Sequence, residues 1–204
     1  ELLDVKAEAD LPRYQRNIEN YVGTVKVPVG VIGPLRVLGR AAQGDFYVPL
    51  ATTEAALVAS YGRGAWLISQ SGGCETLVAD EAAHRTPVFG FASLAEADAF
   101  ARWVMAHFDQ LKAIADATTA HGKLTRIVPT LEGDHVYLAC SFTTADAAGQ
   151  NMVTFATNAL CAFIVDASPI RPTRWFLEAN LSGDKKATAA ALSSVRGRKA
   201  IASI

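Results

Sequence analysis

The sequence predicts an α+β protein in which one module, residues 84–180, is inserted in a larger α/β domain formed by residues 1–83 and 181–204. The inserted region alternates strand-like and helix-like patterns in the order β-α-β-β-α-β, the ferredoxin-like arrangement of one four-stranded sheet with two helices on a single face. The flanking regions do not repeat this pattern. A chain of 204 residues with a hydrophobic fraction of 50% can bury a core in one or two such domains.

The first half of the inserted module predicts a strand and a long helix. Residues 87–92 form a short apolar run. Ser93 and Glu96 then make an S-x-x-E capping box, in which two side chains satisfy amides at the start of a helix. The helix is expected to continue to about Thr118, because its apolar residues recur at three- and four-residue steps. These residues are Ala97, Phe100, Ala101, Val104, Phe108, Leu111 and Ile114.

The second half of the module predicts a hairpin, a helix and a last strand. Residues 123–131 and 135–143 are β-rich runs separated by a turn signal at residues 132–134, which favours an antiparallel hairpin. A helix is expected from about Gly149 until Pro169 ends it. Its predicted apolar stripe is Met152, Phe155, Ala156, Ala159, Leu160 and Phe163. Residues 173–177 are typical of a strand.

The flanking regions supply the larger domain. Residues 25–37 and 45–50 are strand-like, and a helix is expected after Glu54. A second small-residue helix is expected to begin after residue 181. The final AIASI, residues 200–204, is typical of a strand that is beginning, so we expect the larger domain to continue beyond this sequence.

Composition excludes several classes of function. A net charge of -1 without a basic stripe argues against a nucleic-acid partner. Apolar runs are too short for a membrane span or a signal core. The three cysteines are odd in number and, like the four histidines, lack metal-ligand spacing, so we expect neither disulfides nor a metal site. These features predict a reduced, cytoplasmic protein.

Glu54 follows a β-rich run and precedes small residues in VPLATTEAALVAS. Thr52 or Thr53 can serve as the helix N-cap, which would place the carboxylate in the first turn, where the helix dipole favours negative charge. This explanation requires no function. The small side chains behind Glu54 equally leave room for a ligand.

A second polar cluster, Asp184, Lys185 and Lys186, follows a glycine and precedes an alanine-rich stretch. Adjacent lysines are unusual before a helix, because its positive end repels cations. The neighbouring aspartate would favour a charged lysine, whereas the second lysine would disfavour it. A solvated helix cap and a catalytic lysine both remain open on these residues alone.

The third cluster is TADAAGQNM, residues 144–152, between a predicted strand and a predicted helix. Exposed amides at the start of a helix can receive a phosphate or pyrophosphate. The segment is not a G-x-G-x-x-G motif, and an ordinary capped loop explains it equally well.

Together these segments resemble the 3-hydroxy-3-methylglutaryl-coenzyme A (HMG-CoA) reductase family. The resemblance is carried, in the family's order, by ENYVGTVKVPVGVIGPL (19–35), VPLATTEAALVAS (48–60), TADAAGQNM (144–152) and GDKKATAA (183–190). It spans nearly all of residues 17–204, about the first half of the family's catalytic region. In this family a large domain binds the acyl-CoA, and an inserted ferredoxin-like domain binds the nicotinamide cofactor.

The resemblance implies roles for individual residues. Glu54 matches the catalytic glutamate, which moves protons, and Lys185 the catalytic lysine, which stabilises the oxyanion formed on hydride transfer. The implied substrate-binding residues are Ser60, Arg63, Asn180, Asp184 and Lys186. The implied cofactor-binding residues are Asp146, Gly149, Asn151 and Met152, and the cofactor is NADPH or NADH.

The sequence also departs from the family pattern. The substrate-carboxylate arginine falls near residues 75–77, where there is none, and Glu178 replaces an active-site serine. Gly62 replaces an asparagine of the coenzyme A motif, and AAGQNM stands where GMNM is usual. Ala120 stands where an arginine would favour the NADP phosphate. The family's catalytic aspartate and histidine lie further along than this sequence extends.

Two functions follow from the resemblance. The first is an oxidoreductase that reduces HMG-CoA to mevalonate and CoA with two nicotinamide hydrides, in isoprenoid precursor synthesis. The second is a reductase-like homologue that binds another acyl-CoA and has lost or changed the reaction. Glu75 and Glu178 favour the second, whereas the intact ATTE and GDKK segments favour the first. The family also implies a homodimer with active sites at the subunit interface.

Overall fold

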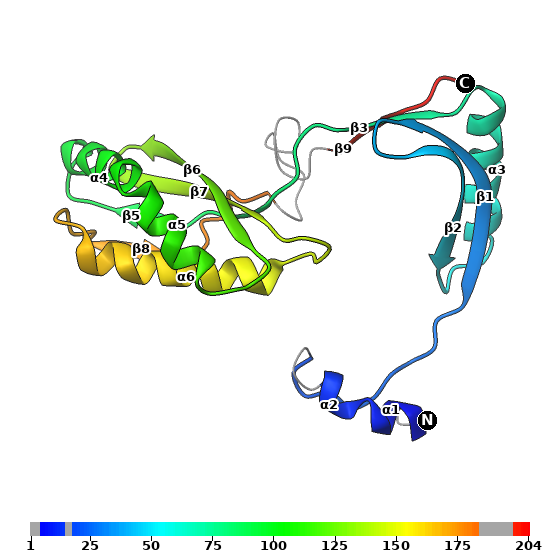
Figure 1. The fold of residues 1–204 in the computed structure, drawn as a ribbon, viewed down its shortest axis with the longest axis horizontal. Helices are drawn as coiled ribbons and strands as arrows, with labels where there is room; N and C mark the ends of the chain where they lie inside the picture. The colour runs from blue at the N-terminus through cyan, green and yellow to red at the C-terminus, as the bar shows by residue number, and fades with distance from the viewer. Residues whose placement is uncertain (1–4, 15–17, 184–197) are drawn as a thin grey trace. The chain divides into compact units, whose positions relative to one another are not determined.

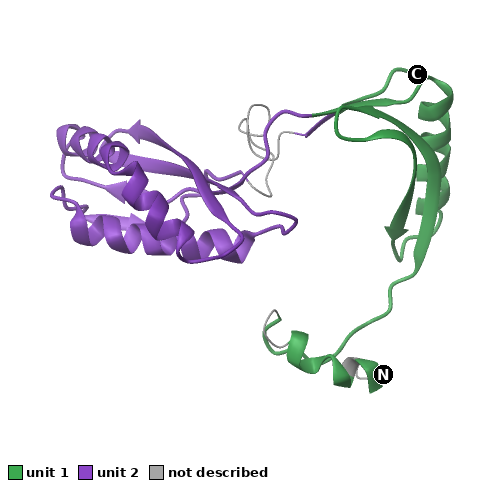
Figure 2. Cartoon of the chain, viewed as in Figure 1, with its two compact units in different colours: residues 1–77, 200–204 green, residues 78–199 purple. Residues whose placement is uncertain are grey.

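The chain divides into two compact units (Figure 2). The computed structural model describes residues 5–14, 18–183 and 198–204. Unit 1 comprises residues 1–77 and 200–204, and unit 2 comprises residues 78–199. Both units combine helices with strands (Figure 1), so the prediction of a mixed α+β protein is confirmed.

Unit 1 is built on a sheet with the strand order β2-β1-β3-β9. Strands β1 and β2 are antiparallel, whereas β1 and β3 are parallel. The elements are α1 (Val5–Ala9), α2 (Leu11–Tyr14), β1 (Val29–Gly39), β2 (Gln43–Ala51), α3 (Leu57–Gln70), β3 (Cys74–Val78) and β9 (Arg198–Ile201). The strand expected near the end of the sequence is therefore present, beginning two residues earlier than predicted.

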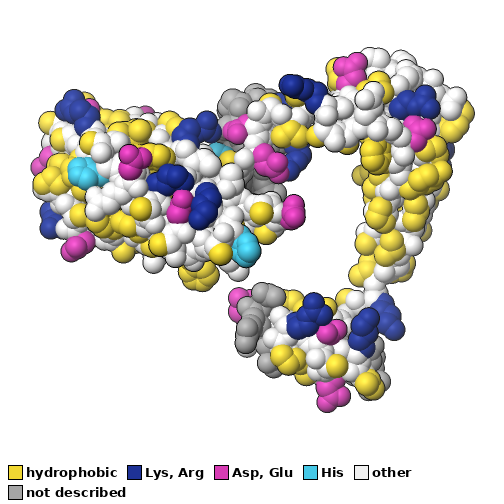
Figure 3. Space-filling model, viewed as in Figure 1, with side chains coloured by type: hydrophobic (Ala, Val, Ile, Leu, Met, Phe, Trp, Pro, Cys, Tyr) yellow, Lys and Arg dark blue, Asp and Glu magenta, His cyan; other side chains and the backbone are white. Residues whose placement is uncertain are grey.

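Helix α3 packs closely on strand β1. Gly30 makes this possible, because a Cβ added there would lie 2.7 Å from a methyl group of Val58. Ile32 and Ala65 are buried at this contact. Much of the remaining apolar surface of β1 and β2 is exposed (Figure 3), including Val29, Val31, Phe46 and Tyr47.

Unit 2 is built around the long strand β7. It pairs with β6 along one edge and with β4 and then β5 along the other, and β5 pairs with β8; every pairing is antiparallel. The elements are β4 (Ala83–Arg85), β5 (Val88–Gly90), α4 (Leu94–Ala106), α5 (Phe108–Asp116), β6 (Lys123–Glu132), β7 (His135–Thr143), α6 (Gln150–Ala167) and β8 (Arg174–Phe176). The predicted hairpin at residues 123–143 is confirmed.

The core of unit 2 lies between one face of this sheet and the three helices. Alternate residues of β7 contribute to it, namely Val136, Leu138, Cys140 and Phe142. Burial in this core raises the pKa of the Cys161 thiol to about 12 and raises that of Cys140 further. Both thiols are therefore protonated and chemically inert near neutral pH.

The predicted capping box at the start of α4 is confirmed. The Ser93 hydroxyl accepts a hydrogen bond from the Glu96 amide at 3.2 Å, and the Glu96 carboxylate accepts one from the Ala92 amide at 3.0 Å. The single helix predicted to follow is wrong in one respect, because it divides at His107 into α4 and α5. The His107 ring contacts the Trp103 carbonyl, 2.8 Å away, and stacks on the Trp103 indole at this break.

The predicted apolar stripe of α6 is rotated about the helix axis. Ala156 and Leu160 of the predicted stripe are buried, but Phe155 is 70% exposed, and Val153 and Ile164, which lie outside the predicted stripe, are buried. The helix is apolar on most of its circumference, so two stripes of the same period fit the sequence. Among the helices that the structure describes, none is both long and apolar enough to cross a bilayer.

Candidate active site

Glu54 lies in the turn between β2 and α3. Its amide donates a hydrogen bond to the Thr52 hydroxyl at 2.9 Å, and its side chain is exposed. The prediction that Glu54 lies in the first turn of a helix capped by Thr52 or Thr53 is wrong. Helix α3 begins only at Leu57, after Ala56 has adopted a left-handed φ of 64°. The Thr52 hydroxyl thus stabilises the turn instead of the helix.

The first turns of α3 carry Ser60 and Arg63. Ser60 lines a largely apolar cavity of about 350 Å³ together with Ile32, Leu35, Tyr61, Gly64, Ala65 and Ile68. Arg63 is exposed and does not line this cavity. An apolar cavity with a cation one helical turn from its edge suits a ligand with an alkyl portion and an anionic group.

The loop between β7 and α6 contains Asp146 and Gly149. The Thr144 hydroxyl donates to the Ala147 carbonyl at 2.7 Å, and the Ala147 amide donates to the Thr144 carbonyl at 3.1 Å. Gly149 is the N-cap of α6 with a φ of 72°, and a Cβ added there would lie 2.2 Å from the Thr144 methyl group. Only glycine fits this position without displacing the loop.

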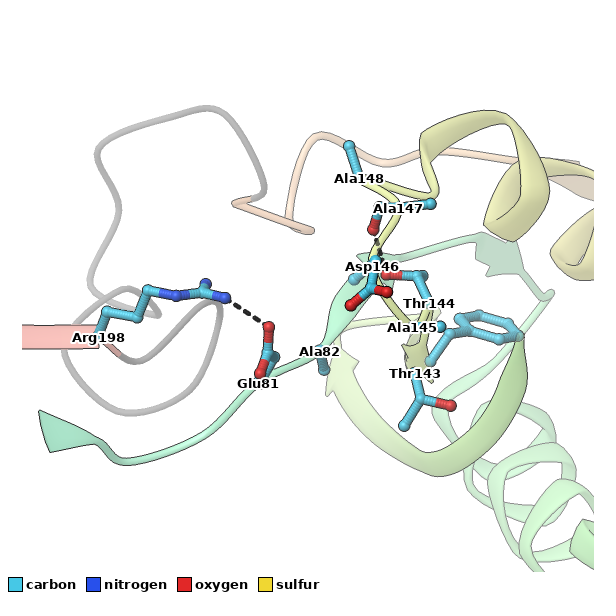
Figure 4. Close-up of a pocket in the computed structure, with 11 residues that line it drawn as sticks. Glu81, Ala82, Thr143, Thr144, Ala145, Asp146, Ala147, Ala148 and Arg198 are labelled. Carbon is cyan, nitrogen blue, oxygen red and sulfur yellow. Dashed lines mark hydrogen bonds and ion pairs between the residues drawn. The ribbon is translucent and has the colours of Figure 1, made fainter. Parts of the chain in front are cut away.

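The loop borders a polar cavity of about 630 Å³ (Figure 4). The lining residues include Glu81, Thr143, Thr144, Asp146, Ala148 and Arg198, and Arg198 forms an ion pair with Glu81. No side chain caps the first amides of α6, and no acidic residue lies in its first turn. The positive end of this 18-residue helix therefore adjoins a space that can receive an anionic group.

Asn151 and Met152 lie in the first turn of α6. Asn151 is exposed, whereas Met152 is half-buried and its sulfur accepts a hydrogen bond from the Thr119 hydroxyl at 3.1 Å. A Cβ on Gly122 would lie 2.9 Å from the Met152 side chain. The loop at residues 119–122, which contains Ala120, thus lies against the start of α6.

Glu178 forms an ion pair that the sequence did not reveal. Its carboxylate accepts a hydrogen bond from Arg85 of β4 at 3.2 Å. The two residues are 93 positions apart in the sequence, so no local motif contains both of them. No sequence signal could have found this pair, because the shielding of Glu178 from solvent and its distant partner are visible only in the folded unit.

Asn180 lies two residues after Glu178, is exposed, and has a left-handed φ of 63°. Asp184, Lys185 and Lys186 lie outside the described residues. Glu54, Ser60 and Arg63 belong to unit 1, and Asp146, Gly149, Asn151, Met152 and Asn180 belong to unit 2. Within the described ranges no three His, Cys, Asp or Glu side chains gather closely enough to hold a metal ion.

The sequence matches a family model over nearly its whole length. The model is that of hydroxymethylglutaryl-coenzyme A reductase, and it matches residues 2–204. The 3-hydroxy-3-methylglutaryl-coenzyme A reductase of Aeropyrum pernix is 44% identical over 185 residues, which cover 91% of this chain and 44% of that protein. That of Methanothermobacter thermautotrophicus is 41% identical over 191 residues, covering 93% of this chain and 48% of that protein.

The fold is also similar to solved structures. The class II 3-hydroxy-3-methylglutaryl-CoA reductase of Streptococcus pneumoniae, solved bound to NADPH, superposes with a TM-score of 0.64 at 18% identity. The match covers 87% of this chain and 51% of that one. The chain spans about half the length of the relatives it matches. On the evidence of the family model and these relatives, the chain belongs to the hydroxymethylglutaryl-coenzyme A reductase family.

Proposed function

We propose that this chain is the acyl-CoA-binding and cofactor-binding part of an enzyme that reduces HMG-CoA to mevalonate and CoA with NADPH or NADH. The observation that carries the proposal is the family match over residues 2–204, supported by relatives named as this reductase at 41% to 44% identity. The proposal includes a cytoplasmic location, with which the three unpaired cysteines agree.

We infer that residues 84–180 form the inserted ferredoxin-like cofactor module within the larger acyl-CoA domain. The spatial order of strands in unit 2, β6, β7, then β4 with β5, then β8, supports this inference because an antiparallel β-α-β-β-α-β module pairs its strands in that order. The three-dimensional similarity to a reductase solved with NADPH agrees with it.

The dinucleotide is proposed to bind at the loop formed by residues 144–149 and the start of α6. The uncapped amides of α6 favour a phosphate group, and the polar cavity beside Asp146 gives it space. Gly149 keeps the backbone in the conformation that leaves these amides accessible. Asn151 can donate further hydrogen bonds, and Met152 orients the first turn against the 119–122 loop.

The chemistry is proposed to depend on Glu54 and Lys185. Two nicotinamide molecules, bound in turn, would each supply one hydride: the first to the thioester carbon, from which CoA then departs as its thiol, and the second to the resulting aldehyde carbon. Each delivery leaves negative charge on an oxygen. Lys185, a cation, would stabilise the negative charge on that oxygen, and Glu54 would transfer a proton to the oxygen. Asp184, Lys186 and Asn180 would orient the lysine and the acyl group.

Ser60 and Arg63 are proposed to bind coenzyme A. The apolar cavity beside Ser60 suits an alkyl portion of the ligand, and the exposed guanidinium of Arg63 suits a phosphate. Exposed apolar side chains on β1 and β2 support the further proposal of a homodimer, since large apolar surfaces are usually covered by another chain.

The alternative function, a homologue with another acyl substrate, rested partly on Glu178. The Arg85 guanidinium compensates the charge of this carboxylate at 3.2 Å, so Glu178 presents no uncompensated negative charge to an acidic acyl group. This contact removes one of the two observations in favour of the alternative.

The experiment supplies HMG-CoA with NADPH or NADH to the protein that contains this chain and follows the loss of nicotinamide absorbance. We expect turnover that falls by about 100-fold or more in Glu54→Gln and in Lys185→Ala. Glu132→Gln, which changes an exposed carboxylate at the β6–β7 turn, is the matched control and should keep full activity. Thermal stabilisation by HMG-CoA without nicotinamide oxidation would overturn the reductase proposal and favour the alternative.

A further inference from the structure

Arg85 contacts two segments that belong to different parts of the proposed site. Its Nη1 donates to Glu178 at 3.2 Å, and its Nη2 donates to the side-chain oxygen of Gln150 at 3.2 Å and to the Gln150 carbonyl at 3.4 Å. Gln150 is the first residue of α6, directly after the proposed dinucleotide loop. Glu178 lies two residues before Asn180. One guanidinium therefore joins the start of the cofactor site to the segment that leads into the substrate site.

The Glu178 side of this contact is anchored to the sheet. The Thr86 amide donates to the Glu178 carboxylate at 3.4 Å, and the Ala179 amide donates to the Thr86 carbonyl at 2.8 Å. The segment after β8 is thus held against the connection between β4 and β5. A planar guanidinium can hold two partners at fixed angles, which a lysine ammonium on a flexible stem cannot reproduce.

The cluster of Arg85, Glu178 and Thr86 is largely shielded from solvent, which restricts the positions that its side chains can take. The side chains of Arg85 and Glu178 are 16% and 28% exposed. Arg85 Nε, Glu178 Oε1 and Thr86 Oγ1 are buried without a hydrogen-bond partner among the residues that the structure describes. Unsatisfied buried polar atoms cost stability, so the cluster stabilises unit 2 less than its ion pair alone suggests. Its arrangement is better explained by a need to fix positions.

We propose that Arg85 is a positioning residue that fixes the first turn of α6 and residues 178–180 in one geometry. The two segments then hold the dinucleotide and the acyl group at a set distance from each other. The identity of these two ligands rests on the proposed function, whereas the coupling between the two segments rests on the contacts of Arg85 alone.

The experiment measures this coupling with Arg85→Lys, Glu178→Gln and the double variant. The first readout is hydrogen exchange at the Val153 amide, which bonds to the Gly149 carbonyl at 3.0 Å in the first turn of α6. Glu178→Gln should raise this exchange about three- to tenfold, although Glu178 is not in α6, and the double variant should show no larger effect than Arg85→Lys. The second readout is the Kd for NADPH, which should rise by a similar factor.

The control is Lys112→Met, which breaks another ion pair of the same unit, with Asp116 at 2.8 Å. It should lower the melting temperature of unit 2 while leaving Val153 exchange and the Kd unchanged, so a loss of stability alone does not mimic the positioning effect. Unchanged Val153 exchange in Glu178→Gln, or effects that add in the double variant, would overturn the role of Arg85. Failure of the unsubstituted protein to bind NADPH or NADH would instead overturn the proposed function, and the exchange readout would still decide the coupling.

Discussion

Left-handed backbone marks three of the segments that the sequence singled out. Asn20, Ala56 and Ala145 lie within them, with φ values of 53°, 64° and 48°, and Asn180, with a φ of 63°, completes the set of such non-glycine residues in the described part of the chain. A residue with a Cβ pays about 1–2 kcal/mol for this conformation. Such strain persists where the surroundings impose it, and it is concentrated at functional sites. The left-handed backbone at Ala56 and Ala145 therefore agrees with their place in the proposed sites.

Gly149 and Gly133 allow a matched test of the loop before α6. Both have positive φ, but a Cβ on Gly133 would meet open space, whereas one on Gly149 would strike Thr144. Gly133→Ala should lower the free energy of unfolding by about 1 kcal/mol from backbone strain alone, and Gly149→Ala by about 2–4 kcal/mol. Urea denaturation measures both values. Equal losses would show that the loop moves away from the new methyl group at no cost.

At the scale of helices and strands, the sequence predicted those features that form through contacts between residues close in sequence. The β6–β7 hairpin was predicted from two β-rich runs and a turn at residues 132–134, and the start of α4 from Ser93 and Glu96. Both predictions were possible because the contacts that form these features are close in sequence. The break at His107 was not predicted, and the buried face of α6 was predicted only in part, through Ala156 and Leu160, since both features depend on packing. Thr52 and Thr53 were both candidate helix caps, and only the folded structure shows that the Thr52 hydroxyl instead accepts a hydrogen bond from the Glu54 amide.

The same limit applies to the candidate site, where residues close in sequence were identified and residues brought together only by the fold were not. Asp146, Gly149, Asn151 and Met152 could be identified because they form one contiguous motif. Arg85 could not, because its partners Glu178 and Gln150 are 93 and 65 residues away. Contacts between residues so far apart leave no repeating pattern in the sequence. They become visible only in the folded unit, where β4 lies beside the end of β8 and the start of α6.

The link between α5 and β6 predicts a pH dependence. Burial opposes ionisation of Asp116, but hydrogen bonds from Lys112 at 2.8 Å and from the Leu124 amide at 2.8 Å outweigh it and lower the pKa of this carboxyl below its usual 3.8. The unfolded chain therefore binds a proton at Asp116 more tightly than the folded chain does. The stabilisation is present above the unfolded pKa and is lost as pH falls through the folded pKa.

Asp116→Asn should remove about 1–2 kcal/mol of stability at pH 7, because it breaks a charged hydrogen bond and an ion pair. The difference from the unsubstituted protein should begin to shrink as pH falls below the usual carboxyl pKa of 3.8 and should be lost once pH is below the lowered pKa of the folded state, where the native carboxylate is protonated. Lys112→Met should reduce the same acid sensitivity in part. Unfolding curves recorded across this range test the prediction, and a difference that stays constant with pH would contradict it.

At the scale of the whole molecule, the two units differ in how they are stabilised. The hydrophobic core cluster of buried residues lies entirely in unit 2. In the described part of unit 1, only Ile32 and Ala65 are buried hydrophobic residues. Because burial of apolar surface is the main stabilising term in folding, unit 1 taken by itself should open more readily than unit 2. A dimer or a bound acyl-CoA that covered its exposed apolar residues would reduce this difference.

Two leucine substitutions test whether the units unfold separately. Leu138 is fully buried in unit 2, and Leu38 in unit 1 is 41% exposed. Leu138→Ala should cost about 2–5 kcal/mol, whereas Leu38→Ala, which leaves little or no cavity, should cost about 1 kcal/mol or less. Since cooperativity follows from a shared core, Leu138→Ala should accelerate amide exchange throughout unit 2 and leave the slowest amides of β1 and α3 unchanged. Hydrogen exchange read by peptide resolves the two units, and equal acceleration in β1 and α3 would mean that the chain unfolds as one cooperative body.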